Sequence, residues 1–394
     1  MPQSIVVAEG VRTPFAEYNG AFSEVSATEL GLIASREALR RARVEPAEVD
    51  HVIAGNVMQT SADAIYLARH IGLKLGVPED RPALTVNRLC GSGFEAIVQA
   101  KQRIQLGEAT TVLAVGTENM SQAPHVIRGA RSGFRLGQGK LEDSLMAALL
   151  DSHTGLFMAQ TSDKLARRLG VTREEQDAYA VESQRRAAAA WAACRLSEEV
   201  VAVEVRKGRK SFLFERDDHL TPDSNVETLA KLSPSFGKDG MVTAGNASGI
   251  VDGAAAVVVT TEENARAKGL VPLGRLVADA AVGCDPTEMG IGPVPAARAA
   301  LKKAGMTLDQ MDLVEINEAF AGQILAVAKE LGLDPDKLNV NGGAIALGHP
   351  LGASGTRLTL TLLKELRRRG KRWGLAGACI GGGQGIAVIV EALS

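Results

Sequence analysis

The sequence predicts an α/β fold made of two similar halves, stacked as a five-layered α-β-α-β-α core with a loop domain inserted in the first half. Short apolar strands alternate with helix-patterned segments, which is typical of a parallel or mixed sheet covered by helices on both faces. The last third repeats the order and spacing of these segments in the first third. The stretch between them, from about residue 120 to 243, is more polar and basic.

The first third supplies the alternating elements in chain order. Apolar runs predict strands, and apolar residues at helical spacing predict helices. We expect strands at 4–8, 49–57, 83–86 and 111–115, and helices at 28–43, 64–75 and directly behind Gly93. A proline fixes the loop after the first strand.

The inserted stretch carries a helical segment at 173–195 and a loop-rich run at 217–224, and a strand at 254–260 brings the chain back to the core. In the last third, 311–317 echoes 49–56, 339–341 echoes the strand end at 85–87, and 373–378 echoes 111–115. A Gly/Ser turn, 352–355, matches the turn at 91–93. The predicted units are therefore 1–120, 121–243 inserted, 244–270 returning to the first half, and 271–394.

The composition is that of an ordinary soluble protein, with 45% hydrophobic and 23% charged residues and a formal net charge of −2. This charge gives no argument for a nucleic-acid partner, and no apolar run approaches the roughly 20 residues that span a membrane. The basic cluster 367–372 could meet phosphate, but a solvated helix end is the favoured interpretation. We expect a soluble, cytoplasmic protein, with the mitochondrial matrix as the alternative in a eukaryote.

The four cysteines, Cys90, Cys194, Cys284 and Cys379, show no metal-type spacing, and the histidines show no ligand spacing. We therefore assign no metal and expect free thiols in a reducing compartment. Cys194 follows an alanine-rich run and is expected in a helix core, whereas Cys284 is expected to be a packed loop thiol.

The chemistry of the first half centres on Cys90, which follows a short strand and precedes Gly91-Ser92-Gly93 and a helix-patterned segment. A helix N-terminus favours thiolate over thiol, so this cysteine is a candidate nucleophile. The glycines allow another molecule to approach the backbone. The alternative for Cys90 alone is a buried cysteine in a glycine-rich turn.

Matching strand ends in the second half carry Asn317, His349 and Cys379, the last followed by the turn at Gly381. Ligands usually bind at the carboxyl ends of strands in α/β sheets, so these residues are expected in one cleft. His349 is a suitable base for a thiol, and backbone N–H groups of Cys90 and the Gly381 turn could hold an oxyanion. Taken singly, His349 could be a loop histidine bonded to backbone, Asn317 a helix cap, and the glycine run a phosphate loop, although it lacks the Lys-Ser/Thr of a P-loop.

At this point the sequence resembles the thiolase family. The motifs that carry the resemblance run in family order over essentially the whole chain: Val86-Asn87-Arg88-Leu89-Cys90-Gly91-Ser92-Gly93, Gly245-Asn246-Ala247-Ser248-Gly249, Asn317-Glu318-Ala319-Phe320, Asn341-Gly342-Gly343-Ala344-Ile345-Ala346-Leu347-Gly348-His349-Pro350 and Cys379-Ile380-Gly381-Gly382-Gly383.

The resemblance implies thiolytic cleavage of 3-ketoacyl-CoA by CoA, or the reverse Claisen condensation of acetyl-CoA. Cys90 would carry the acyl group, His349 would accept its proton, and Cys379 would exchange a proton with the α-carbon. Asn317, through a water, and His349 would hold the thioester oxygen, while the amides of Cys90 and Gly381 would hold the acyl-enzyme oxyanion. Two thiols and an imidazole suffice for this chemistry, so no cofactor is expected; CoA and acyl-CoA are substrates.

The resemblance also implies the substrate contacts. Ser248 would lie near the pantetheine arm, Ser224 and Thr221 near the adenine, and Met158 and Phe320 beside the substrate. Thr221 stands where many relatives carry an arginine. The inserted loop domain implies a homo-oligomer, a tetramer formed as a dimer of dimers.

Several features favour one branch of the family. Phe157-Met158-Ala159 departs from the His-Met-Gly pattern of short-chain enzymes, and Arg88-Leu89, Phe94 and Cys284-Asp285-Pro286 are similar to 3-ketoacyl-CoA thiolases of fatty-acid β-oxidation. The alternatives are an acetyl-CoA acetyltransferase, a decarboxylating ketoacyl synthase and a non-catalytic acyl-CoA carrier. Cys379, in place of a second histidine, argues against the synthase, and the presence of all three reactive residues argues against the carrier.

Overall fold

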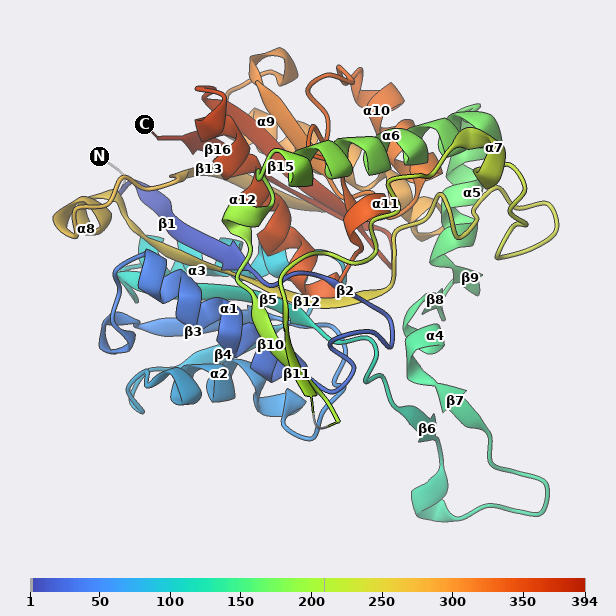
Figure 1. Ribbon diagram of the computed structural model, residues 1–394, viewed down its shortest axis with the longest axis horizontal. Coiled ribbons are helices and arrows are strands. Elements are labelled where there is room, and N and C mark those ends of the chain that lie inside the picture. The colour runs from blue at the N-terminus through green and yellow to red at the C-terminus, as the bar shows by residue number, and fades with distance from the viewer. Residues whose placement is uncertain (1–2, 209, 394) are drawn as a thin grey trace.

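A computed structural model describes residues 3–208 and 210–393 of the chain (Figure 1). Its centre is a 10-stranded sheet with the order β14-β15-β16-β13-β1-β12-β5-β3-β4, and β2 pairs with β12 off this path. The strands are β1 (Ile5–Arg12), β2 (Ala16–Glu17), β3 (His51–Gly55), β4 (Ala83–Val86), β5 (Thr111–Glu118), β12 (Val251–Thr261), β13 (Gly274–Gly283), β14 (Leu313–Ile316), β15 (Trp373–Ile380) and β16 (Gln384–Ala392).

The two halves of the sheet repeat one topology, as the sequence predicts. From its outer edge the first half runs β4-β3-β5-β12-β1, and the second runs β14-β15-β16-β13. The counterpart of β4 in the second half is reduced to one parallel bridge between Leu338 and Val314, so the strand predicted at 339–341 is absent from this described part of the chain. Asn339 instead turns with a φ of 46°.

The sequence predicts two stacked sheets, but the structure joins them along their first strands. Val6 pairs with Arg275 and Val7 with Gly274, antiparallel, which links β1 to β13. This contact needs residues far apart in the sequence and has no local signal. The stacked halves therefore share one continuous ladder of strands.

Helices form three layers around the two halves of the sheet. The helices are α1 (Ala27–Arg41), α2 (Leu67–Leu75), α3 (Ser92–Gln105), α9 (Pro293–Ala304), α10 (Ala321–Leu331) and α12 (Leu351–Arg368). One apolar cluster joins α3 and α12 to both halves of the sheet, a second packs α1 and α2 on the first half, and a third packs α9 and α10 on the second half. Figure 1 shows α3 and α12 in the middle of this arrangement. The result is the expected five-layered core.

The central helices cross closely because glycines lie at their contact. A Cβ on Gly355 of α12 would lie 2.2 Å from the backbone nitrogen of Phe94, and one on Gly93 of α3 would lie 2.6 Å from that of Thr356. The sequence predicts a turn at 352–355, but these residues lie inside α12. Glycine weakens a helix, yet here its missing side chain permits the crossing.

The segment between β5 and β12 holds short hairpins and helices rather than core strands. Its elements are β6 (His125–Ile127), β7 (Leu141–Asp143), α4 (Ser144–Ala148), β8 (Leu150–Asp151), β9 (Leu156–Phe157), α5 (Met158–Arg168), α6 (Arg173–Ala192), β10 (Val203–Lys207), β11 (Lys210–Phe214) and α7 (Val226–Leu229). Two further short helices, α8 (Glu262–Ala267) and α11 (Ala344–Leu347), lie outside this segment and belong to the core. The β6–β7 hairpin projects from the body as an arm (Figure 1). Cys194, expected in a helix core, is exposed just beyond α6 with a φ of 58°, so that prediction is wrong.

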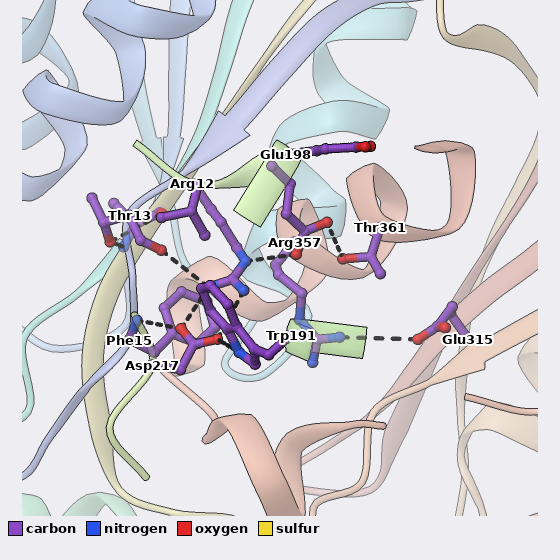
Figure 2. A network of polar contacts seen from close by, with 12 residues as sticks. Arg12, Thr13, Phe15, Trp191, Glu198, Asp217, Glu315, Arg357 and Thr361 are labelled. Atoms are coloured by element: carbon purple, nitrogen blue, oxygen red, sulfur yellow. Dashed lines mark hydrogen bonds and ion pairs between the residues drawn. The ribbon is translucent and has the colours of Figure 1, made fainter. Parts of the chain in front are cut away.

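A buried ionic network anchors this segment to the core (Figure 2). Arg12, at the end of β1, pairs with Glu199 at 2.7 Å and with Asp217 at 2.7 Å, and Thr361 of α12 donates to Glu199 at 2.9 Å. Trp191 of α6 donates to Asp217 at 3.2 Å. Removing one partner would leave a buried charge uncompensated. The intact network therefore holds the inserted segment in one position on the core. Within the described residues, no helix is long and apolar enough to cross a membrane.

Candidate active site

Cys90 lies in a tight turn between β4 and α3, as the sequence predicts. The side chain of Asn87 accepts the N–H of Leu89 at 2.9 Å, and that of Ser92 accepts the N–H of Arg88 at 2.8 Å and donates to the carbonyl of Leu89 at 2.7 Å. Leu89 has a φ of 46°, a left-handed conformation that is uncommon for a bulky residue and typical of functional turns. The turn therefore holds Cys90 in a fixed position at the start of α3.

The surroundings of Cys90 favour the neutral thiol. The sulfur receives backbone hydrogen bonds from Gly381 and from Cys90 itself, which lower its pKa, but burial outweighs them and raises the pKa to about 11. The sequence predicts a thiolate favoured by the helix N-terminus, and the structure differs because desolvation of the charged form is the larger effect. The two amides expected to hold an oxyanion do converge on this sulfur.

His349 precedes α12 and is 5% exposed. Its Nδ1 lies 2.5 Å from the hydroxyl of Ser354, and its Nε2 has no hydrogen-bond partner in the described part of the chain. Burial lowers the pKa of the imidazole to about 3, and the charge of Arg357 adds to the shift. The ring is thus neutral at neutral pH, and the alternative of a loop histidine bonded to backbone does not hold for this side chain.

Asn317 directly follows β14, and its side chain is fully buried. Neither its amide nitrogen nor its amide oxygen has a partner among the described residues. The residue that caps α10 is Phe320, so Asn317 is not the cap that the sequence left open. Because an unpaired buried amide costs about 1–3 kcal/mol, this amide is available to pair with a water or a substrate group.

Cys379 lies on β15, two residues before Gly381, and is fully buried. It packs against Met289 and Ala319, with Met158 and Phe320 at the edge of the same cluster. Burial raises the pKa of its thiol well above the usual value, and the nearby thiols of Cys90 and Cys284 add to the shift. Cys379 is therefore also a neutral thiol in the resting protein.

An apolar pocket of about 740 Å³, its open mouth included, adjoins these groups. Four of the predicted residues line it: Met158, Ser248, Phe320 and His349. The other lining residues are mainly apolar and come largely from the inserted segment and the return to β12: Met120, Leu149, Phe157, Ala159, Ser235, Phe236, Val242, Thr243, Ala244, Ala247, Gly249, Ile250 and Leu351. Cys90 packs against an apolar cluster that includes Met120 and Leu351, two residues of the pocket lining, so its turn lies next to the pocket.

Backbone hydrogen bonds tie the predicted motifs together around this pocket. The N–H of Ser248 donates to the carbonyl of Ala319 at 3.0 Å, and that of His349 donates to Gly249 at 2.9 Å. Thr221 and Ser224 lie outside the pocket lining, with their hydroxyls 2.9 Å apart. The structure thus gathers Cys90, His349, Cys379 and Ser248 around the pocket, and sets the predicted adenine contacts apart.

Sequence reasoning missed two buried carboxylates that support the site. Glu118, at the end of β5, accepts the N–H groups of Val57 at 3.1 Å, Met58 at 3.0 Å and Gly352 at 2.8 Å. Burial raises its pKa to about 7. The predicted strand stopped at residue 115, so Glu118 was not recognised at the strand end that would have marked it.

Glu318, within the motif that begins at Asn317, ties α6 to the second half. It accepts hydrogen bonds from Tyr179 at 2.9 Å, Ser183 at 2.7 Å and Asn339 at 2.9 Å. The inserted segment is therefore fastened to the loop that carries Asn317.

Comparison with known proteins agrees with these motifs. Models of the thiolase N-terminal domain and the thiolase C-terminal domain match residues 5–263 and 270–392. The chain belongs to the thiolase family. Mitochondrial 3-ketoacyl-CoA thiolase of Homo sapiens is 52% identical to this thiolase over 390 residues, which is 99% of this chain and 98% of the human one. Acetyl-CoA acetyltransferase of Escherichia coli strain K12 is 47% identical over 394 residues, 100% of both chains.

The expected fold is confirmed by a solved relative. The crystal structure of human mitochondrial 3-ketoacyl-CoA thiolase in complex with CoA matches with a TM-score of 0.96 and 52% identity, over 99% of this chain and 98% of the other. This thiolase is an enzyme of the acyltransferase class, as the resemblance implies.

Proposed function

We propose that this thiolase is a 3-ketoacyl-CoA thiolase of fatty-acid β-oxidation, which cleaves 3-ketoacyl-CoA with CoA to give acetyl-CoA and an acyl-CoA shortened by two carbons. The observation that carries the proposal is the apolar pocket lined by His349, walled by side chains such as Leu149, Phe157 and Phe236. Such a wall suits an aliphatic chain longer than an acetyl group. The names of the relatives at 49–52% identity support the same activity.

In the proposed first step, Nε2 of His349 accepts the thiol proton while the sulfur of Cys90 bonds to the C3 carbonyl carbon of the substrate. The N–H groups of Cys90 and Gly381 stabilise the oxyanion. The C2–C3 bond then breaks, its electron pair remains on the acetyl-CoA fragment, and Cys379 supplies the proton that completes acetyl-CoA. A water held by Asn317, together with His349, stabilises the thioester oxygen of that fragment. The unpaired Asn317 amide and the unpaired Nε2 support these roles.

In the second step, the thiol of CoA attacks the acyl group on Cys90. His349 returns its proton to the sulfur of Cys90, and Cys379 regains a proton from the incoming thiol. Two thiols and one imidazole thus supply every proton transfer, so the proposed reaction needs no metal or organic cofactor. CoA and acyl-CoA are the substrates of a ping-pong cycle.

Steady-state thiolysis of 3-ketoacyl-CoA substrates from C4 to C16 tests this proposal, with mass spectrometry of the trapped enzyme. An acyl adduct on Cys90 and turnover beyond C4 are expected. Turnover confined to C4 would assign the acetyl-CoA acetyltransferase activity after which the relative of Escherichia coli is named. Absence of both adduct and turnover would favour a carrier of acyl-CoA.

Single substitutions distinguish the proposed roles of Cys90 and Cys379. Cys90→Ser should form no acyl-enzyme, because an unactivated hydroxyl is a far weaker nucleophile near neutral pH. Cys379→Ser should still acylate at Cys90 but should not exchange the α-protons of acetyl-CoA with deuterated water. Exchange at the wild-type rate in that variant would contradict the role of Cys379.

We also propose that the protein is a homotetramer, a dimer of dimers, in a reducing compartment such as the cytoplasm or the mitochondrial matrix. The arm exposes Ile127, Phe134, Leu136 and Leu141, and a projecting apolar surface suits a subunit contact. The edge strand β4 is partly exposed along its whole length, and a free sheet edge invites pairing. Sedimentation should give a tetramer for the wild type and a dimer for Leu136→Glu. The four free cysteines support a reducing compartment.

A further inference from the structure

We propose that Ser354 is a positioning residue that holds His349 in the tautomer with hydrogen on Nδ1, so that Nε2 is free to accept the proton of Cys90. This inference rests on the proposed function, because it concerns the base of the proposed acylation step.

The hydroxyl of Ser354 lies between two groups. It is fully buried in the first turn of α12, 2.5 Å from Nδ1 of His349 and 3.0 Å from the carbonyl oxygen of Pro350. The carbonyl can only accept a hydrogen bond, and a hydroxyl has one hydrogen to donate. When Ser354 donates to Pro350, as serine in a helix commonly does toward the carbonyl four residues earlier, Nδ1 must donate to the hydroxyl.

Because its surroundings keep the ring neutral, its ability to accept a proton at Nε2 depends on which ring nitrogen carries the hydrogen. Burial and the positive charge of Arg357 hold the imidazole neutral. Arg357 is itself fully buried on α12, its guanidinium has no hydrogen-bond partner among the described residues, and its nearest carboxylate is Glu315 at 3.9 Å (Figure 2). A neutral imidazole carries one N–H, so an Nδ1 that donates to Ser354 leaves a lone pair on Nε2.

The tautomer decides whether the ring can act as a base. With hydrogen on Nδ1, the unpaired Nε2 takes the thiol proton while the Cys90 sulfur bonds to the carbonyl carbon, and the resulting imidazolium donates its Nδ1–H to Ser354. With hydrogen on Nε2, the same atom has no lone pair to accept it. Losing Ser354 therefore lowers the fraction of enzyme that is competent for acylation.

The helix offers a matched control in Thr359. Its buried hydroxyl also donates to the carbonyl four residues earlier, Gly355, at 2.9 Å, and no hydrogen bond joins it to His349 among the described residues. Thr359→Val removes one buried hydroxyl from the same helix as Ser354→Ala does, but leaves the partner of Nδ1 in place.

The test is the rate at which iodoacetamide alkylates Cys90 at pH 7, followed by peptide mass spectrometry in the intact enzyme. We expect a roughly tenfold loss for Ser354→Ala, the size of one hydrogen bond, near-wild-type rates for Thr359→Val, and recovery of most of the rate in Ser354→Thr. Nitrogen-15 solid-state NMR of histidine-labelled protein should show hydrogen on Nδ1 of His349 in the wild type and a tautomer mixture in Ser354→Ala.

Three results would overturn the inference: an unchanged rate in Ser354→Ala, an equal loss in Thr359→Val, or hydrogen on Nε2 in the wild type. His349→Ala separates this outcome from failure of the proposed function. If His349→Ala alkylates at the wild-type rate, His349 is not the base. If only the Ser354 variants behave as wild type, the base role stands and the positioning role does not.

Discussion

Replacing Gly355 with alanine tests the close crossing of α3 and α12. The added Cβ would lie 2.2 Å from the backbone nitrogen of Phe94, whereas ordinary contacts begin near 3.4 Å, so the helices must part locally by about 1.2 Å. Overpacking of this kind costs about 1–3 kcal/mol. The opposing atom belongs to backbone and cannot rotate away, so the upper end applies. Alanine in a helix returns about 1 kcal/mol, which leaves a net loss of about 2 kcal/mol.

This loss corresponds to a measurable thermal shift. Unfolding entropy of about 2.1 cal/mol/K per residue predicts that 2 kcal/mol lowers the Tm of a chain of 394 residues by about 2–3 °C. The assay is calorimetry at fixed protein concentration, because subunit association also shifts Tm. Gly72→Ala in α2 is the control: its Cβ would meet a methyl group of Val52 at 3.2 Å, so its Tm should stay within about 1 °C of the wild type.

The same substitution should also slow acylation, because the starts of the two crossing helices carry Cys90 and His349. We expect the rate of Cys90 acylation by acyl-CoA to fall at temperatures well below Tm. A Gly355→Ala protein with wild-type or higher Tm would refute the reasoning, because the backbones would then have room that the structure denies them.

Three further predictions follow from the buried groups. The rate of Cys90 alkylation should not change between about pH 5 and 9, because a His349 pKa of about 3 and a Cys90 pKa of about 11 leave both groups neutral throughout. In His349→Ala, the rate should rise tenfold per pH unit. A wild-type rate that also rises with pH would contradict the role of His349 as the base for Cys90. Asn317→Ala should lower the rate of thiolysis at least tenfold. Its Tm should stay equal or rise, because the substitution removes an unpaired buried amide. A large fall in Tm would show that the amide is paired in the resting enzyme. Glu118→Gln should lack the fall in stability, about 3 kcal/mol, that a Glu118 pKa raised to about 7 produces in the wild type as the pH rises from about 4.5 to 7. Urea unfolding across that range measures it, and parallel pH profiles of the two proteins would count against the prediction.

Much of the core could be predicted from the sequence because its signals are local. The strand 83–86 matches β4, and the helix at 28–43 matches α1 within two residues at each end. The Gly-Ser-Gly turn correctly placed Cys90 before a helix. Asn317 and Cys379 were recognised as site candidates because each comes directly after an apolar run that predicts a strand of the repeat.

The errors concern properties that depend on distant parts of the chain. The state of the Cys90 thiol is decided by how deeply other elements bury it, which the turn itself does not encode. Gly355 reads locally as a turn residue, and only its contact with Phe94 explains a glycine inside a helix. Cys194 follows an alanine run that is typical of a buried helix, but α6 ends at Ala192, so the cysteine lies beyond the helix and is exposed. Likewise, nothing near Ser354 predicts that it contacts an imidazole.

The division of the pocket between two parts of the chain bears on how this family diversifies. The groups proposed for bond making lie on core strands and at the starts of packed helices, while much of the pocket wall, including Leu149, Phe157 and Phe236, comes from the inserted segment. Substitutions in that wall can reshape the acyl site without disturbing the positions of the core residues. Selection can therefore change the preferred substrate in small steps, each leaving a working enzyme. Relatives that share about half of their residues with this chain bear both the 3-ketoacyl-CoA thiolase and the acetyl-CoA acetyltransferase names, as such stepwise divergence would produce.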